Sequence, residues 1–184
     1  IGLGIPAEPL FRSDSVVIRQ NAPTTGETSY DDLVFGHMTF PNDTLDDMIL
    51  IKADGMPTYN FANVIDDHLM GITHVMRGLE YISSTPKYNL LYEALGWEIP
   101  QYIHMAPVMR DATHKLSKRD GDLEFASLRN LYGSPEPIIG LLAYLAGQIE
   151  KPEPLRVDDL LPIFNSHNIP TTNIIVPSEL IRLQ

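Results

Sequence analysis

The sequence contains no cysteine. This excludes a disulfide framework and a thiolate metal site, so no structural zinc is expected, and it fits a reducing compartment. The sequence also lacks an apolar run long enough to span a bilayer, and no signal-peptide pattern opens it. We therefore expect a cytoplasmic protein with no membrane partner.

Basic residues are scarce as well. The 13 lysines and arginines are outnumbered by 24 aspartates and glutamates, which gives a formal net charge of −11. Such an acidic chain is poorly suited to broad electrostatic capture of nucleic acid, so no DNA partner is expected. A small basic patch on an acidic protein can still dock a phosphate backbone, so RNA is not excluded. At 184 residues the chain has room for one large domain or two small ones.

Three of the few basic residues are clustered, at Lys115, Lys118 and Arg119. Polar and glycine-containing stretches on both sides place this cluster in a loop. Cationic side chains on a loop suit an oligophosphate, because they can follow charge that moves during phosphoryl or nucleotidyl transfer. A basic run is also common on solvated loops, and composition alone does not separate the two interpretations.

The order of the expected elements predicts an α/β fold. Apolar runs bounded by glycine and proline predict strands at residues 48–52, 72–76 and 102–104, with helices at 58–70 and 86–95 between them. Strands and helices that alternate through short loops are typical of a parallel, doubly wound sheet. Thr58 is the expected N-cap of the first helix, and Gly71 ends it.

Helix 58–70 is expected to have two different faces. At about 100° per residue, Phe61, Ile65 and Leu69 share a side that would pack on the sheet. The opposite side would face a cleft and carries Tyr59, Asn63, Asp66 and Met70. The adjacent Asp66 and Asp67 would point about 100° apart on a helix, so we expect capping or ion-pair roles for them and no metal site.

Further elements are expected outside this region. A strand is predicted at 16–20 and a strand or hairpin arm at 30–40, and helices are predicted at 123–131, 135–145 and 157–164. Ser134 would cap the second of these helices, with Pro135 in its first turn. Residues 141–147 are apolar on nearly every side and are expected to be buried, whereas residues 174–184 form a loosely specified tail.

Two motifs resemble those of one enzyme family. Residues 115–119 read KLSKR, which is similar to the KMSKS-type signature of class I aminoacyl-tRNA synthetases in the form that glutamyl-tRNA synthetases carry. Residues 54–71 read DGMPTYNFANVIDDHLMG and resemble that family's DGxPTYNFANVVDDHLMG block. The resemblance continues in order and spacing from about Val16 to about Gly147.

The resemblance implies how the chain is organised. Residues 48–120 would form the second half of a Rossmann-like catalytic domain with a parallel sheet. Residues 1–47 would belong to the acceptor-stem-binding insertion and its connection, and residues 121–184 would form a small helical region and tail. The family's first half carries a His-x-Gly-His motif and an arginine that binds glutamate, and neither has a counterpart here. We therefore expect a C-terminal part of the catalytic domain that is inactive alone.

The function implied by the resemblance is that of a glutamate–tRNA ligase. Such an enzyme uses ATP, with Mg²⁺, to convert glutamate to glutamyl-adenylate, and then transfers the acyl group to the 3′ end of tRNA(Glu). Two alternatives stay open. One is a glutamyl-Q tRNA(Asp) synthetase-like enzyme, which glutamylates a modified anticodon base. The other is a non-catalytic, synthetase-derived module that binds tRNA or a protein.

The resemblance also implies individual roles. Arg77 and Tyr59 match the residues that bind the glutamate side chain, and an arginine at the carboxyl end of a parallel strand suits a carboxylate. A surface ion pair is the alternative for Arg77. Asn63 matches a residue at the ATP and tRNA-terminus region, and Glu80 one near the terminal nucleotide. The alternative for Asn63 is an amide that satisfies a nearby backbone group, and the alternative for Glu80 is a solvent-exposed loop carboxylate.

The remaining matched residues concern ATP. Val108 and Met109 fall on the segment whose backbone contacts the adenine ring. Lys115 and Lys118 match the catalytic lysines, and Lys118 and Arg119 also match the ATP-binding part of the signature. Attack on the α-phosphorus builds charge on the departing pyrophosphate, so a lysine that closes over the phosphates raises the rate only if it binds the transition state more strongly than ATP.

Overall fold

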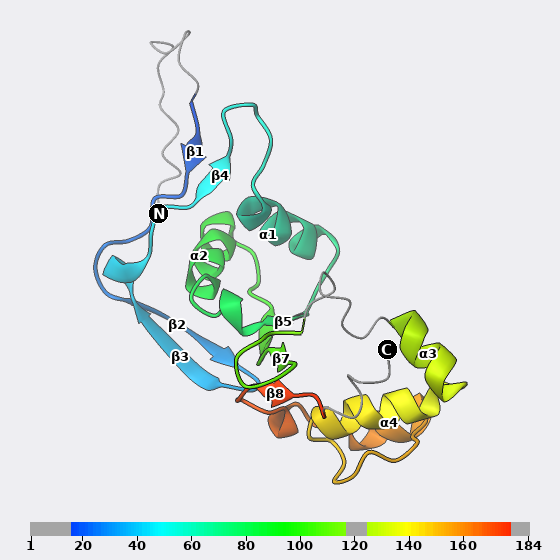
Figure 1. The fold of residues 1–184 in the computed structure, drawn as a ribbon. Coiled ribbons are helices and arrows are strands. Elements are labelled where there is room, and N and C mark those ends of the chain that lie inside the picture. The colour runs from blue at the N-terminus through cyan, green and yellow to red at the C-terminus, as the bar shows by residue number, and fades with distance from the viewer. Residues whose placement is uncertain (1–15, 117–124, 178–184) are drawn as a thin grey trace. The chain divides into compact units, whose positions relative to one another are not determined.

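The computed structural model describes residues 16–116 and 125–177 (Figure 1). By its internal contacts the chain divides into two compact units. The first unit comprises residues 1–76 and 80–102, and the second comprises residues 77–79 and 103–184. The three regions expected from the resemblance remain predictions.

The first unit contains a long hairpin built from β2 (Glu27–Asp32) and β3 (Gly36–Pro41). Alternate residues of β2 are buried, as expected for a strand with one face against a core. The turn is held by Asp32, whose carboxylate accepts hydrogen bonds from the backbone N–H groups of Val34 and Phe35, both at 2.9 Å. Gly36 follows with a φ of 74°, a conformation that favours glycine. Of the two alternatives for residues 30–40, the hairpin arm is the one observed, as β3, and the turn falls inside the range expected to be strand.

This hairpin is part of a four-stranded mixed sheet of order β3-β2-β6-β5. β2 is antiparallel to β3 and parallel to β6 (Gln101–Met105), where Asp32 is opposite Tyr102. The neighbour of β6 is β5 (His74–Gly78), and α2 (Thr85–Leu95) connects the two in sequence. The predicted α/β class with parallel strands is therefore confirmed.

One expected member of the sheet lies elsewhere. β4 (Ile49–Ile51) pairs antiparallel with β1 (Ile18–Arg19) and forms a separate two-stranded sheet. Its apolar run was sufficient to predict a strand. The choice of partner depends on hydrogen bonds between distant segments, and periodicity carries no information about them.

Helix α1 (Tyr59–Leu69) packs on β4 and α2. Its buried side is defined by Val64 and Phe61, which belong to one apolar cluster with residues of β4 and α2. The prediction that Leu69 would be buried is wrong, because Leu69 is 74% exposed in the last turn. Thr58 is the N-cap, but its hydroxyl donates to the carbonyl of Ile49 at 2.7 Å and makes no capping hydrogen bond.

Helix α2 is the most deeply buried helix of the first unit. Seven of its eleven residues are buried, and the core cluster combines aromatic and aliphatic side chains from this helix, α1 and the β4 segment: Met48, Leu50, Val64, Tyr88, Leu91 and Tyr92. The helix ends at Gly96, whose left-handed φ of 70° provides the C-cap.

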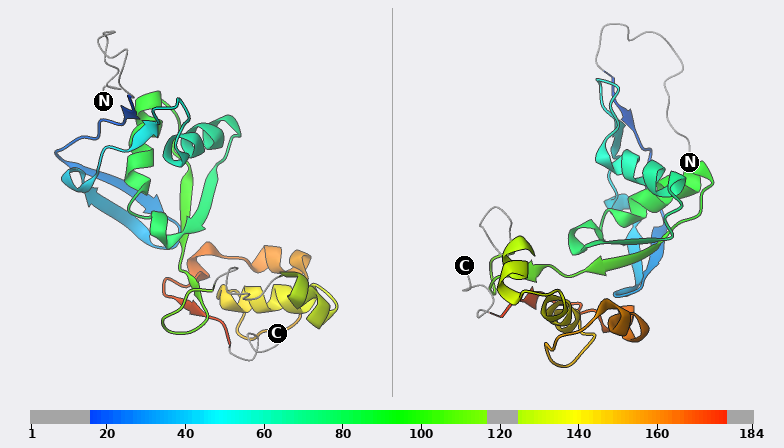
Figure 2. Two further views of the ribbon diagram at one scale, coloured as in Figure 1. Left: turned by 45° about the horizontal axis from the view of Figure 1, so that its top comes forward. Right: turned by 90° about the vertical axis from the view of Figure 1, so that its right-hand side faces the viewer.

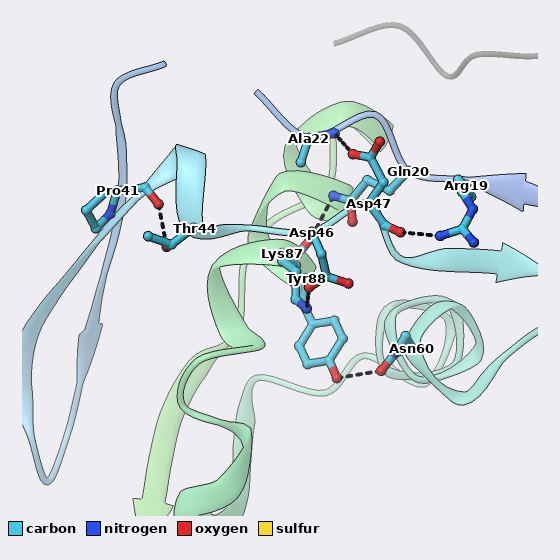
Figure 3. A network of polar contacts seen from close by, with 10 residues as sticks. All are labelled: Arg19, Gln20, Ala22, Pro41, Thr44, Asp46, Asp47, Asn60, Lys87 and Tyr88. Carbon is cyan, nitrogen blue, oxygen red and sulfur yellow. Dashed lines mark hydrogen bonds and ion pairs between the residues drawn. The ribbon is translucent and has the colours of Figure 1, made fainter. Parts of the chain in front are cut away.

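Polar contacts attach the segment around Asp46 and Asp47 to α2 and β1 (Figure 3). Lys87 of α2 forms an ion pair of 2.6 Å with Asp46, and the hydrogen bond from its ammonium group lowers the pKa of Asp46. Asp47 accepts a hydrogen bond from the backbone N–H of Ala22 at 2.9 Å. These contacts fix the chain that leads into β4, and hence the start of α1.

The second unit is built from short strands and helices. β7 (Val108–Met109) pairs parallel with β8 (Ile174–Ile175), so part of the predicted tail is a strand. The helices are α3 (Phe125–Tyr132), α4 (Glu136–Leu145) and α5 (Val157–Leu160). The chain after α5 turns into a 3₁₀ segment, Leu161–Ile163, so the helix expected over 157–164 is interrupted where Pro162 removes a backbone donor.

Helix α4 lies beside α5 (Figure 2). Its Leu141 and Ala143 are buried, but Leu142 and Tyr144 are exposed, so the expectation that this whole apolar stretch is buried is wrong. The N-cap is Pro135 and not Ser134, whose hydroxyl instead donates to the carboxylate of Glu136 and lowers the pKa of that group. Within the described ranges, no helix is long and apolar enough to cross a membrane.

Candidate functional site

The first unit carries three of the predicted site residues, and two of them lie on α1. Tyr59 in the first turn is 59% exposed, and its ring is 6.0 Å from that of Tyr81. Asn63 is one turn further along the same side. Its amide oxygen is buried and accepts no hydrogen bond from the described residues. A buried acceptor without a donor is costly unless a ligand or water satisfies it, so the amide oxygen of Asn63 is suited to accept from either, and the predicted contact with ATP or the tRNA terminus stays a prediction.

Glu80 and Tyr81 belong to a short 3₁₀ helix, Leu79–Tyr81, that follows β5. Glu80 is exposed, so its carboxylate is accessible. Tyr81 was not among the predicted site residues. Its contact with Tyr59 makes it part of the same aromatic surface, and the only signal in the sequence was its position four residues after Arg77.

Arg77 lies in the second unit, next to the end of β5. It is half-buried, and its Nε donates a hydrogen bond to Nε2 of His104 at 3.2 Å. This partner on β6 is fully buried. Arg77 is thus held by a buried acceptor on the neighbouring strand, and its role in binding glutamate stays a prediction. That Tyr59, Asn63 and Arg77 converge on one cleft stays a prediction, because the first two residues belong to the other unit.

The predicted adenine segment and the first signature lysine are neighbours in the second unit. Met109 of β7 forms an antiparallel bridge with Lys115. The backbone N–H of Leu116 donates to the carbonyl of Val108 at 2.9 Å. The chain therefore folds back on itself between 109 and 115, and the start of the signature lies along the strand predicted to contact adenine.

The turn that closes this pairing is organised by Asp111. Its carboxylate accepts hydrogen bonds from the backbone N–H groups of Thr113 and His114, at 2.8 and 2.9 Å, and from the side chains of both residues. These bonds, the one from the Thr113 backbone first, hold the pKa of Asp111 well below its usual range. The sequence predicted a loop here but gave Asp111 no role.

An apolar cavity of about 310 Å³ lies beside β7 within the second unit. Val108 and Leu116 line it, together with residues of α4 and of the segment around β8. Apolar side chains on both sides of the turn thus line the same cavity, and this packing helps to hold the first residues of the signature in place. Nothing in this lining selects a polar ligand.

The other two signature residues, Lys118 and Arg119, lie outside the described residues, so their predicted roles stay predictions. Among the residues that the structure does describe, no group of three or more histidine, aspartate or glutamate side chains is arranged to hold a metal ion. No described residue is therefore assigned to Mg²⁺.

Comparison with known proteins places these features in one family. Residues 7–161 match the family model of the catalytic domain of class I tRNA synthetases (E and Q). A glutamate–tRNA ligase of Clostridium botulinum (strain Eklund 17B) is 60% identical over 129 residues, which are 70% of this chain and 27% of that protein. The ligase of Clostridium acetobutylicum is 54% identical over 154 residues, or 83% of this chain and 32% of that protein.

Solved structures agree with the sequence comparison. A glutamate–tRNA ligase from Elizabethkingia meningosepticum, crystallised in complex with its amino acid, matches with a TM-score of 0.76 and 33% identity, over 90% of this chain and 37% of that one. The chain thus spans about a third of the length of the relatives it matches. On these matches, the chain belongs to the class I tRNA synthetases of the glutamate and glutamine group, within their catalytic domain.

Proposed function

We propose that the protein that contains this chain is a glutamate–tRNA ligase. It activates glutamate with ATP to form glutamyl-adenylate and passes the acyl group to the 3′ end of tRNA(Glu). The family includes both glutamate and glutamine enzymes, so membership alone does not distinguish the two substrates. The relatives at 54% and 60% identity support glutamate.

The observation that carries the proposal is Arg77 at the end of β5. A guanidinium fork matches the two oxygens of a carboxylate and pairs with them through charge-assisted hydrogen bonds. The amide of glutamine offers one oxygen and no charge, so a site built on Arg77 favours glutamate. Tyr59 would add a hydroxyl on the side of α1 that also carries Asn63.

The chemistry of the proposed reaction needs little from the protein beyond position and charge. The glutamate α-carboxylate attacks the α-phosphorus of ATP, and pyrophosphate leaves. The backbone of Val108 and Met109 would hold the adenine, and Lys115, which is bridged to Met109, would approach the phosphates from the adjoining strand. Lys118 would stabilise the charge that develops on the leaving group. Mg²⁺ would enter with ATP and offset phosphate charge, and no step is assigned to it here.

Aminoacylation by the full-length protein tests the proposal. Purified protein, ATP and labelled glutamate are incubated with tRNA that is either intact or shortened by its 3′-terminal adenosine. A ligase charges only the intact tRNA, because the acyl acceptor is the terminal ribose. Charging of both forms would show transfer to a base, as in a glutamyl-Q-type enzyme, and charging of neither would favour a non-catalytic module.

A further inference from the structure

A fully buried histidine lies against Arg77, and the proposed mechanism does not use it. His104 is 0% exposed on β6, the strand adjacent to β5 in the sheet. Burial of a polar side chain carries a cost that a hydrogen bond must offset. The Nε2 atom of His104 accepts a hydrogen bond from Nε of Arg77 at 3.2 Å, and both residues belong to the second unit.

This hydrogen bond defines the state of the imidazole. A guanidinium group has five N–H donors and no acceptor, so Nε2 of His104 must present a lone pair. The ring is therefore neutral and carries its proton on Nδ1. A doubly protonated ring would place a second positive charge against the guanidinium and would remove the acceptor.

The bond also constrains how Arg77 can bind a carboxylate. An arginine pairs with a carboxylate either through its two terminal nitrogens or through Nε and one terminal nitrogen. Because the Nε–H of Arg77 is directed at His104, the second arrangement would require this bond to break. The guanidinium plane is thus oriented so that its terminal fork is the edge for an incoming carboxylate.

We infer that His104 is a positioning residue for glutamate recognition, which acts by fixing the guanidinium of Arg77. This inference rests on the proposed function and assigns a role to a residue that does not itself contact the substrate. Its consequence is specific: loss of the acceptor at the Nε2 position weakens glutamate binding and leaves ATP binding and the maximal rate largely intact.

Two matched variants of the full-length protein test this role. In His104→Gln the side-chain amide reaches the position of Nε2 and can accept from Arg77. In His104→Asn the amide reaches only the position of Nδ1. Glutamate-dependent exchange between ATP and pyrophosphate, with tRNA present, gives KM for glutamate, KM for ATP and kcat. We expect His104→Asn to raise KM for glutamate roughly tenfold and to leave KM for ATP and kcat within about twofold of the unaltered protein. His104→Gln should stay close to the unaltered protein in all three constants.

A double-mutant cycle ties the effect to Arg77. In an Arg77→Lys background the Nε donor is absent, so His104→Asn should change KM for glutamate no further. Equal effects of the Asn and Gln variants, a general loss in all three constants, or additive effects in the cycle would each overturn the positioning role. Absence of exchange in the unaltered protein would instead overturn the proposed function, and the inference with it.

Discussion

Asp111 shows how a single carboxylate determines the geometry ahead of the signature. Four donors from Thr113 and His114 surround it, although the side chain is itself half exposed. The antiparallel bridge between Met109 and Lys115 begins directly beyond this turn. The position of Lys115, the first lysine of the signature, is therefore set by local hydrogen bonds and not by a distant part of the fold.

The first prediction concerns the titration of Asp111. Its pKa is lowered in the folded protein, so the carboxylate stabilises the turn above about pH 4, and this contribution is lost as the pH falls below that value. Carbon-13 NMR of the Asp111 carboxyl should give a midpoint well below about 3.9. Thr113→Val keeps the backbone donor but removes the hydroxyl, and should move the midpoint part of the way up. An unshifted midpoint in the unaltered protein would contradict the turn.

The second prediction concerns Lys118. If its ammonium group binds the leaving pyrophosphate more strongly than ground-state ATP, Lys118→Ala in the full-length protein should raise the barrier by about 3 kcal/mol, on the order of a hundredfold in rate. The apparent affinity for ATP should change far less, because the adenine contacts remain. Single-turnover formation of adenylate as a function of ATP concentration separates the two effects.

The exposed Lys151 provides the control for this variant. Lys151→Ala removes the same charge at a position far from the signature in sequence and should leave both parameters unchanged. A Lys118→Ala protein with a near-normal maximal rate and a reduced affinity for ATP would show that Lys118 only tethers phosphate.

At the scale of helices and strands, close backbone packing makes one glycine of α4 irreplaceable. A Cβ on Gly140 would lie 1.7 Å from the carbonyl oxygen of Glu153. The chain at 153–155 follows the helix here, and the backbone N–H of Leu155 donates to the carbonyl of Glu136 at 3.0 Å. Only a residue without a side chain allows this approach.

The third prediction follows from this contact. Gly140→Ala should destabilise the second unit by roughly 2–3 kcal/mol, because backbone must move to admit the methyl group, and this exceeds the gain in helix propensity of about 1 kcal/mol. Gly133→Ala is the control, since that position has open space and only a positive φ of 71°. Its cost should be smaller, about 1–2 kcal/mol. Thermal unfolding of both variants gives the comparison, and an unchanged midpoint for Gly140→Ala would contradict the packing.

The elements themselves were largely predictable, because their signals are local. The apolar spacing and the terminal glycine located α1, and the strand–helix–strand order around α2 predicted the α/β class. The sequence patterns failed to predict features that depend on contacts between segments far apart in the chain. The two-residue strand β8 exists only through its pairing with β7, and the burial of His104 against Arg77 depends on neighbouring strands. The exposure of Leu69 likewise depends on where the elements that cover α1 end.

The candidate site was less predictable than the helices and strands from local sequence patterns. Its residues came from the resemblance, residue by residue, and not from periodicity. The spacing of Tyr59 and Asn63 on one side of α1 did follow from helical geometry. The roles of Asp111 and Tyr81 had no comparable signal, since a turn-forming carboxylate and a half-exposed aromatic residue look ordinary in sequence.

At the scale of the whole molecule, the predicted site draws on both units. Tyr59, Asn63 and Glu80 belong to the first unit, and Arg77 with the β7 segment belongs to the second. In the proposed reaction these two sets act on one glutamate and one ATP in the full-length protein. An acidic chain of net charge −11 would contact tRNA through a limited basic surface, so charging should weaken as the salt concentration rises.

A crystal structure of the full-length protein with glutamate and a non-hydrolysable ATP analogue would test directly whether Arg77 binds the glutamate side chain. The account predicts that the terminal nitrogens of Arg77 lie about 2.7–2.9 Å from the side-chain carboxylate of glutamate. The Tyr59 hydroxyl should donate a hydrogen bond to the same carboxylate, and Nε of Arg77 should still donate to Nε2 of His104. The adenine should lie along the backbone of Val108 and Met109. A glutamate whose side chain is held by other residues, with Arg77 directed away from it, would contradict the account.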